Sequence, residues 1–208
     1  MQKALKVLAV SFACLTGVAT PSIAEQGSAA EDAGVSIDAA TAFAKDLTSK
    51  ATAALTSTKS ESEQLAEFQR VLAEGLALDV IGKFMIGDIR RSMNDAQITR
   101  YDAAFPGYLT RLYADQFADI VGRPLTVIDA KALGARDVIV RTQFTRSDGP
   151  PINVDWRIRK LRTGEQKAID IIVSGVSIML VKREEFSAYV SQNSIDALIE
   201  RIEREAAA

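Results

Sequence analysis

The chain has 208 residues, of which 48% are hydrophobic and 25% are charged, and its formal net charge is −2. This composition is typical of a folded globular domain and excludes a disordered chain, a collagen-like repeat and a polytopic membrane protein. The sequence contains no histidine, which excludes Ser-His-Asp and Cys-His catalytic groups and histidine-containing zinc sites. The composition therefore favours binding over catalysis, and no net positive charge attracts the chain to nucleic acid.

Residues 1–24 are predicted to be an export signal. Lys3 and Lys6 give a positive start, residues 5–18 are almost wholly apolar or small, and Ala24 ends a stretch that fits a cleavage site. The apolar run is shorter than the ~20 residues of a comfortable membrane span. Two alternatives remain, an uncleaved membrane anchor and a lipoprotein.

Cleavage after Ala24 defines the expected product. Cys14, the only cysteine and the one residue that a lipoprotein could use, lies in the middle of the apolar run and is removed. We expect a soluble, disulfide-free protein in a bacterial periplasm, with a flexible leader over residues 25–35 and a single domain over residues 36–206.

Helical periodicity dominates the first half of the expected domain. Apolar residues recur every three or four positions, and residues suited to N-capping precede the runs. Asp79 is expected to cap the third helix, Gly87 to end it, and Pro106 to kink the fourth. Four helices are predicted, over residues 43–55, 60–76, 80–86 and 94–120.

After Gly122 the hydrophobic period changes from about 3.6 to 2, which predicts β-strands joined by short turns and therefore antiparallel pairing. Asp155 and Asp170 are expected to point outward, and Gly175 to end the sheet. Two further helices are predicted to begin at Ser177 and Ser194. The strands are expected over residues 125–130, 138–144, 152–159 and 169–173, with Ile169 facing inward in the last.

This order of elements predicts an α+β fold, in which a curved antiparallel sheet of about four strands packs against a helical layer. The inward faces of both layers carry mainly large apolar side chains. They form either a closed hydrophobic core or the wall of a cavity for an apolar ligand, because the two have the same periodicity in sequence.

The outward face of the predicted sheet carries Arg141, Arg157 and Arg159, and Lys160 and Arg162 lie beside them. These arginines form either a solvated strand face that discourages edge-to-edge pairing or a docking patch for an acidic partner or a lipid headgroup.

Catalysis without histidine would need carboxylates and tyrosines. A periplasmic small-molecule enzyme would first use Asp155 with Tyr108 or Tyr113. A third reading is a non-lipid envelope adaptor with a filled core. No catalytic residue, metal ligand or cofactor is assigned.

Two stretches of the sequence, taken together, resemble those of a known protein family. The first is DVIGKFMIGDIR at residues 79–90, and the second is residues 154–173 followed by SGVSIM at residues 174–179. Their order and spacing resemble the MlaC family of periplasmic phospholipid-binding proteins, also called toluene-tolerance proteins, and its hopanoid-associated branch. The resemblance covers roughly residues 36–204. Ile89 and Gln166 stand where the family usually has tryptophan.

The resemblance implies an α+β domain with a deep apolar cavity that takes phospholipid acyl tails and leaves the headgroup outside. It also implies a monomeric carrier, not an enzyme. The carrier would shuttle lipid between an outer-membrane lipoprotein complex and an inner-membrane ABC transporter with an MCE-domain ring, and so maintain outer-membrane lipid asymmetry. On this reading the strand alternation and the helix stripes predict these wall residues: Val80, Ile81, Phe84, Met85, Phe105, Leu109, Val140, Val154, Trp156, Ile171, Val173, Val176 and Met179.

Overall fold

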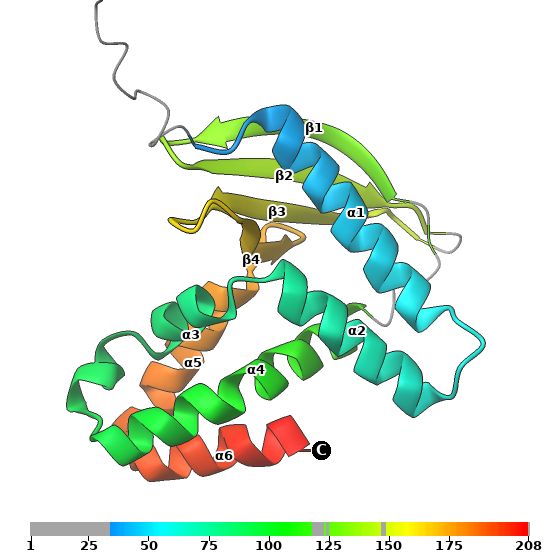
Figure 1. Cartoon of the computed structure of the whole chain (residues 1–208). Coiled ribbons are helices and arrows are strands. Elements are labelled where there is room, and N and C mark those ends of the chain that lie inside the picture. Colours follow the sequence, from blue (N-terminus) through cyan, green and yellow to red (C-terminus); the bar gives the residue numbers. More distant parts are fainter. Residues whose placement is uncertain (1–33, 118–122, 124, 147–148, 208) are drawn as a thin grey trace, which may run out of the picture. The chain divides into compact units, whose positions relative to one another are not determined.

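A computed structural model describes residues 34–117, 123, 125–146 and 149–207 of the chain (Figure 1). The predicted export signal and the last three residues of the predicted fourth helix lie outside these ranges. No helix in the described ranges is long and apolar enough to cross a bilayer. The elements are α1 (Ile37–Leu55), α2 (Glu61–Gly75), α3 (Leu78–Ile86), the 3-10 helix η1 (Gly87–Ser92), α4 (Asp95–Phe117), β1 (Leu125–Leu133), β2 (Asp137–Phe144), β3 (Ile152–Lys160), β4 (Gln166–Val173), β5 (Val176–Ser177), α5 (Ile178–Gln192) and α6 (Ile195–Ala207).

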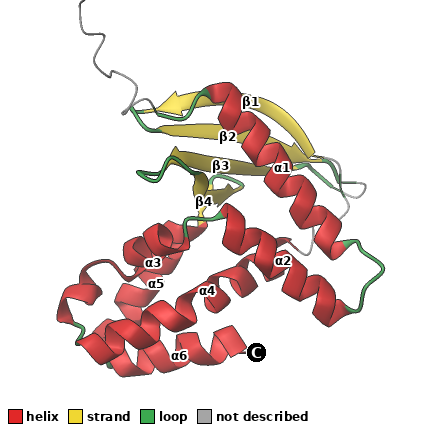
Figure 2. Ribbon diagram, viewed as in Figure 1, coloured by secondary structure: helices red, strands yellow, loops and turns green. Residues whose placement is uncertain are grey.

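The strands form one sheet in the order β1-β2-β3-β4-β5, and every neighbouring pair is antiparallel (Figure 2). This confirms the predicted α+β fold. Gly175 does not end the sheet, because the two-residue strand β5 follows it. Ser174 and Gly175 have φ angles of 50° and 85°. A two-residue hairpin turn needs this left-handed backbone, and the turn pairs Val176 with Val173.

A bulge in β4 breaks the expected alternation. Ala168 pairs with Ile158, and Asp170 pairs with Arg157, so Ile169 is the extra residue. Ala168 therefore takes the inward position that period 2 assigned to Ile169. Ile169 is buried but lies outside the main hydrophobic cluster.

Asp170 is buried, whereas alternation placed it on the solvated face. Only 4% of the residue is exposed, because β5 and the start of α5 pack against β4 here. The Ser177 hydroxyl donates a hydrogen bond to Oδ2 of Asp170 at 2.7 Å. Burial raises the pKa of Asp170, although hydrogen bonds to the carboxylate oppose that shift. Ser177 also caps α5 by accepting from the Leu180 N–H, as predicted.

The segment between α2 and α3 joins the free edge of β4. Leu76 forms a parallel bridge with Ala168, and the Ala77 N–H donates to the Ala168 carbonyl at 2.9 Å. This pairing makes Ala77 the N-cap of α3, so the predicted cap by Asp79 is wrong. Asp79 instead lies in the first turn and forms an exposed ion pair with Lys83.

The helices take two positions relative to the sheet. α1 lies across one face of the strands, and the other helices contact the sheet mainly at β4 (Figure 1). Small buried side chains on α1 allow this close packing, namely Ala40, Ala44, Ala51 and Ala54. The core therefore continues from beneath the sheet into the helical layer.

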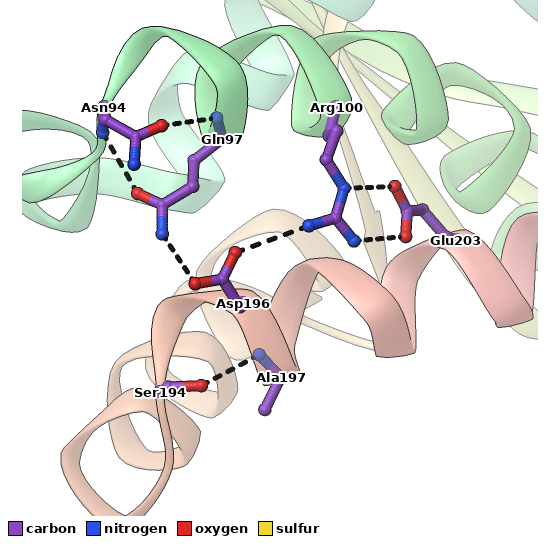
Figure 3. Close-up of polar contacts among 7 residues, drawn as sticks. All are labelled: Asn94, Gln97, Arg100, Ser194, Asp196, Ala197 and Glu203. Carbon is purple, nitrogen blue, oxygen red and sulfur yellow. Dashed lines mark hydrogen bonds and ion pairs between the residues drawn. The ribbon is translucent and has the colours of Figure 1, made fainter.

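Parallel helices α4 and α6 are joined at their N-terminal ends (Figure 3). Gln97 exchanges capping hydrogen bonds with Asn94, and its side-chain amide also donates to Asp196 of α6 at 2.9 Å. Arg100 forms a bidentate pair with Glu203, at 2.7 and 2.9 Å, and a further ion pair with Asp196. Acidic side chains near helix N-termini also offset the positive ends of the helix dipoles.

Candidate functional site

Most of the predicted wall residues meet in one hydrophobic cluster between the sheet and the helices. Phe84 and Val173 are partly buried and pack against this cluster, whereas Val80 is half-buried and lies outside it. Val176 is 53% exposed, because the β4–β5 turn leaves it on the short edge strand with little cover. Eleven of the thirteen predicted residues thus come together; the fully buried ones are Ile81, Met85, Phe105, Leu109, Val140, Val154, Trp156, Ile171 and Met179.

Trp156 lies at the centre of the sheet wall. Val140 and Ile171 pair with it on the neighbouring strands, and only 1% of its surface is exposed. Its indole N–H donates to the Thr142 hydroxyl at 3.2 Å, and that hydroxyl donates in turn to the Val154 carbonyl. These polar atoms are satisfied within the wall, so the surface that it presents to the helices is apolar.

The helical wall is formed by a close crossing of α3 and α4. A Cβ at Gly82 would lie 3.0 Å from a ring carbon of Phe105, so only glycine permits this approach without a shift. The Tyr101 hydroxyl donates to the Gly82 carbonyl at 2.8 Å. An open hollow of about 330 Å³ lies at the crossing and is lined in part by Tyr101, Phe105 and Pro106. Tyr101 was not among the predicted wall residues, although it belongs to the same helical stripe.

The three predicted docking arginines lie on the sheet face opposite the core, and each forms an ion pair. Arg141 makes a bidentate pair with Asp129. Arg157 and Arg159 both bind Asp137, with N–O distances of 2.7 and 2.6 Å, and the Asp137 side chain is only 3% exposed. The sequence reasoning missed both aspartates, although the cross-strand register places each directly opposite an arginine.

The ion pairs with Arg157 and Arg159 change the pKa of Asp137. Burial raises it, but the hydrogen bonds and charges of the two guanidinium groups outweigh burial and hold the pKa below its usual range. The same kind of hydrogen bond, from Arg141, lowers the pKa of Asp129. The arginine face is therefore a network of paired charges with a positive excess.

Asp155 does not meet the tyrosines that an enzyme would need. It pairs with Arg141 and Ile172 on the outward face, whereas Tyr108 and Tyr113 belong to the buried cluster on the other side of the sheet. Burial raises the pKa of both tyrosines. In the part of the chain that the structure describes, no group of three or more Asp or Glu residues is placed to hold a metal ion.

Comparison with known proteins agrees with this architecture. The fold is similar to that of a phospholipid-binding protein from Ralstonia solanacearum, solved in complex with a phospholipid, with a TM-score of 0.68. The two share 18% sequence identity over 81% of this chain and 97% of that chain. The family model described as MlaC protein matches residues 45–204, which confirms the resemblance of the two sequence motifs. The chain therefore belongs to the MlaC family.

Proposed function

We propose that this protein is a periplasmic lipid carrier, which binds the acyl tails of a phospholipid, or of a hopanoid-like lipid, between its sheet and its helices. The observation that carries the proposal is the apolar wall, in which eleven predicted residues gather and the polar atoms near Trp156 satisfy one another. Membership in the MlaC family supports it, as does the phospholipid bound by the similar protein.

The physics of transfer explains why such a wall is useful. Each methylene buried from water contributes ~0.8 kcal/mol, so a free two-tailed lipid does not cross an aqueous space at a useful rate. An apolar protein interior replaces the bilayer as the environment of the tails. Because the competing state is a membrane, we propose that lipid is exchanged at partners: an outer-membrane lipoprotein complex and an inner-membrane ABC transporter with an MCE-domain ring.

Native mass spectrometry of protein purified gently from the periplasm tests the proposal. We expect a bound species that is heavier than the protein by the mass of a phospholipid and that releases the same lipid on solvent extraction. Lipid-free protein from a lipid-rich source would count against the carrier and favour an adaptor with a filled core.

The wall itself is tested by the double variant Leu109→Trp, Val154→Trp. One indole is added from α4 and one from the sheet, so co-purifying lipid is expected to fall at least about tenfold. Overpacking costs about 1–3 kcal/mol per site, so circular dichroism must verify that the variant stays folded.

A matched control adds the same two side chains outside the wall. Val176 and Leu180 are 53% and 50% exposed, and the variant Val176→Trp, Leu180→Trp is expected to keep its lipid. A folded wall variant that carried as much lipid as this control would place the tails elsewhere.

We also propose that the outward arginine face orients the carrier on an acidic partner. Residues 123–175 carry ten Lys and Arg against six Asp and Glu, although the whole chain is net acidic.

Reversing the charge of Arg157 or Arg159 would break the ion pairs with Asp137 and destabilise the fold. The double variant Lys160→Glu, Arg162→Glu therefore tests the charge of this face with less effect on stability. Both residues are exposed. We expect slower lipid transfer to partner-containing membranes at low salt, a weaker salt dependence and unchanged bound lipid. Unaltered low-salt rates would remove the face from the transfer mechanism.

A further inference from the structure

Helices α3 and α5 pack against each other (Figure 1), and Arg183 of α5 lies at their contact. Its Cζ atom is 4.8 Å from the centre of the Phe84 ring, and its Nη1 donates a long hydrogen bond to the Phe84 carbonyl at 3.4 Å. Gly87 lies against the same group, since a Cβ there would be only 3.1 Å from Cζ. These contacts hold a partly buried guanidinium in place.

Arg183 differs from the other cations of α3, η1 and α5, because each of those forms an ion pair with a carboxylate. The pairs are Lys83 with Asp79, Arg90 with Asp102, Arg91 with Asp88, and Lys182 with Glu185. In the described part of the chain, no carboxylate forms an ion pair with Arg183. Glu184 is exposed, and consecutive residues of a helix do not face each other. Together these charges balance, so the distinctive feature is local: the guanidinium has no anionic acceptor within hydrogen-bond distance.

Arg183 also lies at the border of the proposed tail-binding wall. Phe84, whose ring it covers, packs against the hydrophobic cluster, and Met179, about one helical turn before Arg183, is buried in that cluster. Leu180 and Val181 of the same helix are large apolar residues that stay exposed. A polar group at the border of an apolar site orients the ligand whose apolar part enters the site. The position of Arg183 therefore suits an amphiphile with an anionic group.

We propose that Arg183 binds the phosphate group of the lipid whose tails occupy the hydrophobic cluster. A guanidinium presents parallel N–H groups to a phosphate, and such charge-assisted hydrogen bonds are about twice as strong as neutral ones. The carrier thereby selects a phospholipid over a phosphate-free lipid, including a phosphate-free hopanoid-like lipid. An acidic side chain of a protein partner is disfavoured, because a phospholipid brings the anion and the apolar tails in one molecule. This inference rests on the proposed lipid-carrier function and adds the residue that selects the lipid class.

The test offers the delipidated protein equal amounts of phosphatidylglycerol and diacylglycerol with the same acyl chains. Solvent extraction of the reisolated protein and mass spectrometry then quantify the bound lipids. We expect phosphatidylglycerol to be bound preferentially, and Arg183→Gln to lower that preference at least about tenfold, because charge-assisted hydrogen bonds are lost. Binding of diacylglycerol on its own is expected to be the same in both proteins.

Arg91→Gln is the matched control. It removes the same charge from η1, where the Arg91 side chain is 85% exposed, and it is expected to keep the preference for phosphatidylglycerol. Arg183→Lys retains the charge without the parallel N–H groups and is expected to keep only part of that preference.

The outcomes separate this inference from the carrier function. Equal binding of the two lipids by the unaltered protein would overturn the inference and leave the carrier function intact, even if Arg183→Gln failed to fold. An unchanged preference in folded Arg183→Gln would exclude Arg183 as the phosphate ligand. Glycerol phosphate, which has no tails, is expected not to displace the lipid, and displacement by it would indicate a site for free phosphate instead. Failure of the unaltered protein to bind either lipid would contradict the carrier function, and this inference with it.

Discussion

Replacing Asp137 with asparagine is expected to lower the free energy of unfolding by about 3 kcal/mol. The side chain of Asp137 is 3% exposed, and it holds two guanidinium groups whose side chains are only 32% and 25% exposed. The amide keeps the shape of the carboxylate but removes its charge, so Arg157 and Arg159 of β3 lose the counter-ion that they share at the start of β2. Urea denaturation at neutral pH measures the loss.

The nearby pair of Arg141 and Asp129 provides the control. Both side chains are 45% exposed and solvent screens their attraction, so Asp129→Asn is expected to destabilise the protein far less than Asp137→Asn does. An equal loss in the two variants would contradict the argument, because it would mean that the burial of Asp137 adds nothing to the strength of its ion pairs.

Acid should reproduce the effect of the Asp137 replacement. The folded-state pKa of Asp137 is below its usual value, so its contribution to stability is complete above the unfolded pKa of about 3.9 and is lost as the pH falls toward the folded value. We therefore expect the difference in unfolding free energy between the unaltered protein and Asp137→Asn to be constant near neutrality and to shrink below about pH 4. A difference that grew on acidification would contradict the direction of the pKa shift.

Trp156→Ala is expected to destabilise the domain by about 3–5 kcal/mol, since it removes the largest fully buried side chain of the sheet wall. The loss combines the burial of the indole with the void that its neighbours on β2 and β4 leave only partly filled. The Thr142 hydroxyl keeps its own bond to the Val154 carbonyl, so an unsatisfied polar group adds little.

Val176→Ala is the control for Trp156→Ala, because Val176 was predicted to belong to the same wall but is exposed. This replacement is expected to change the free energy of unfolding by less than about 0.5 kcal/mol. Both variants are compared by urea denaturation after lipid has been removed. A loss below about 1 kcal/mol for Trp156→Ala would indicate that the indole borders an empty cavity in the lipid-free protein instead of a packed core.

Much of the fold was predictable because one face of each main element is buried. Period 2 located the four long strands, since only alternate side chains of β3, such as Val154 and Trp156, enter the core. Local capping chemistry located other boundaries. Ser60, at the predicted start of the second helix, forms a capping box with Glu63, and Ser177 and Ser194 cap the last two helices. The cap predicted at Asp79 failed because a long-range pairing with β4 sets the start of α3.

Features that depend on contacts between distant segments were not predictable. One extra residue at Ile169 shifts the alternation of β4, and no local signal marks that bulge. Asp170 is buried by the elements that follow it, and the environment of Asp137 depends on strand register. Eleven of the thirteen predicted wall residues lie in one hydrophobic cluster because they follow periodicity, and their role in lining a lipid cavity stays a prediction. The space between the sheet and the helices depends on how side chains from separate elements fit together.

The backbone pairing along the edge of β4 affects whether the protein can self-associate at high concentration. The edge of β4 that faces away from β3 is covered near its C-terminal end by β5. Near its N-terminal end it is covered by the bridge between Leu76 and Ala168. An exposed strand edge is a template on which an extended segment of another molecule can add itself and begin a fibril. Here such a segment would find no long run of free N–H and C=O groups on β4. Backbone pairing thus closes this edge of the sheet to strand addition, whatever the interior of the domain contains.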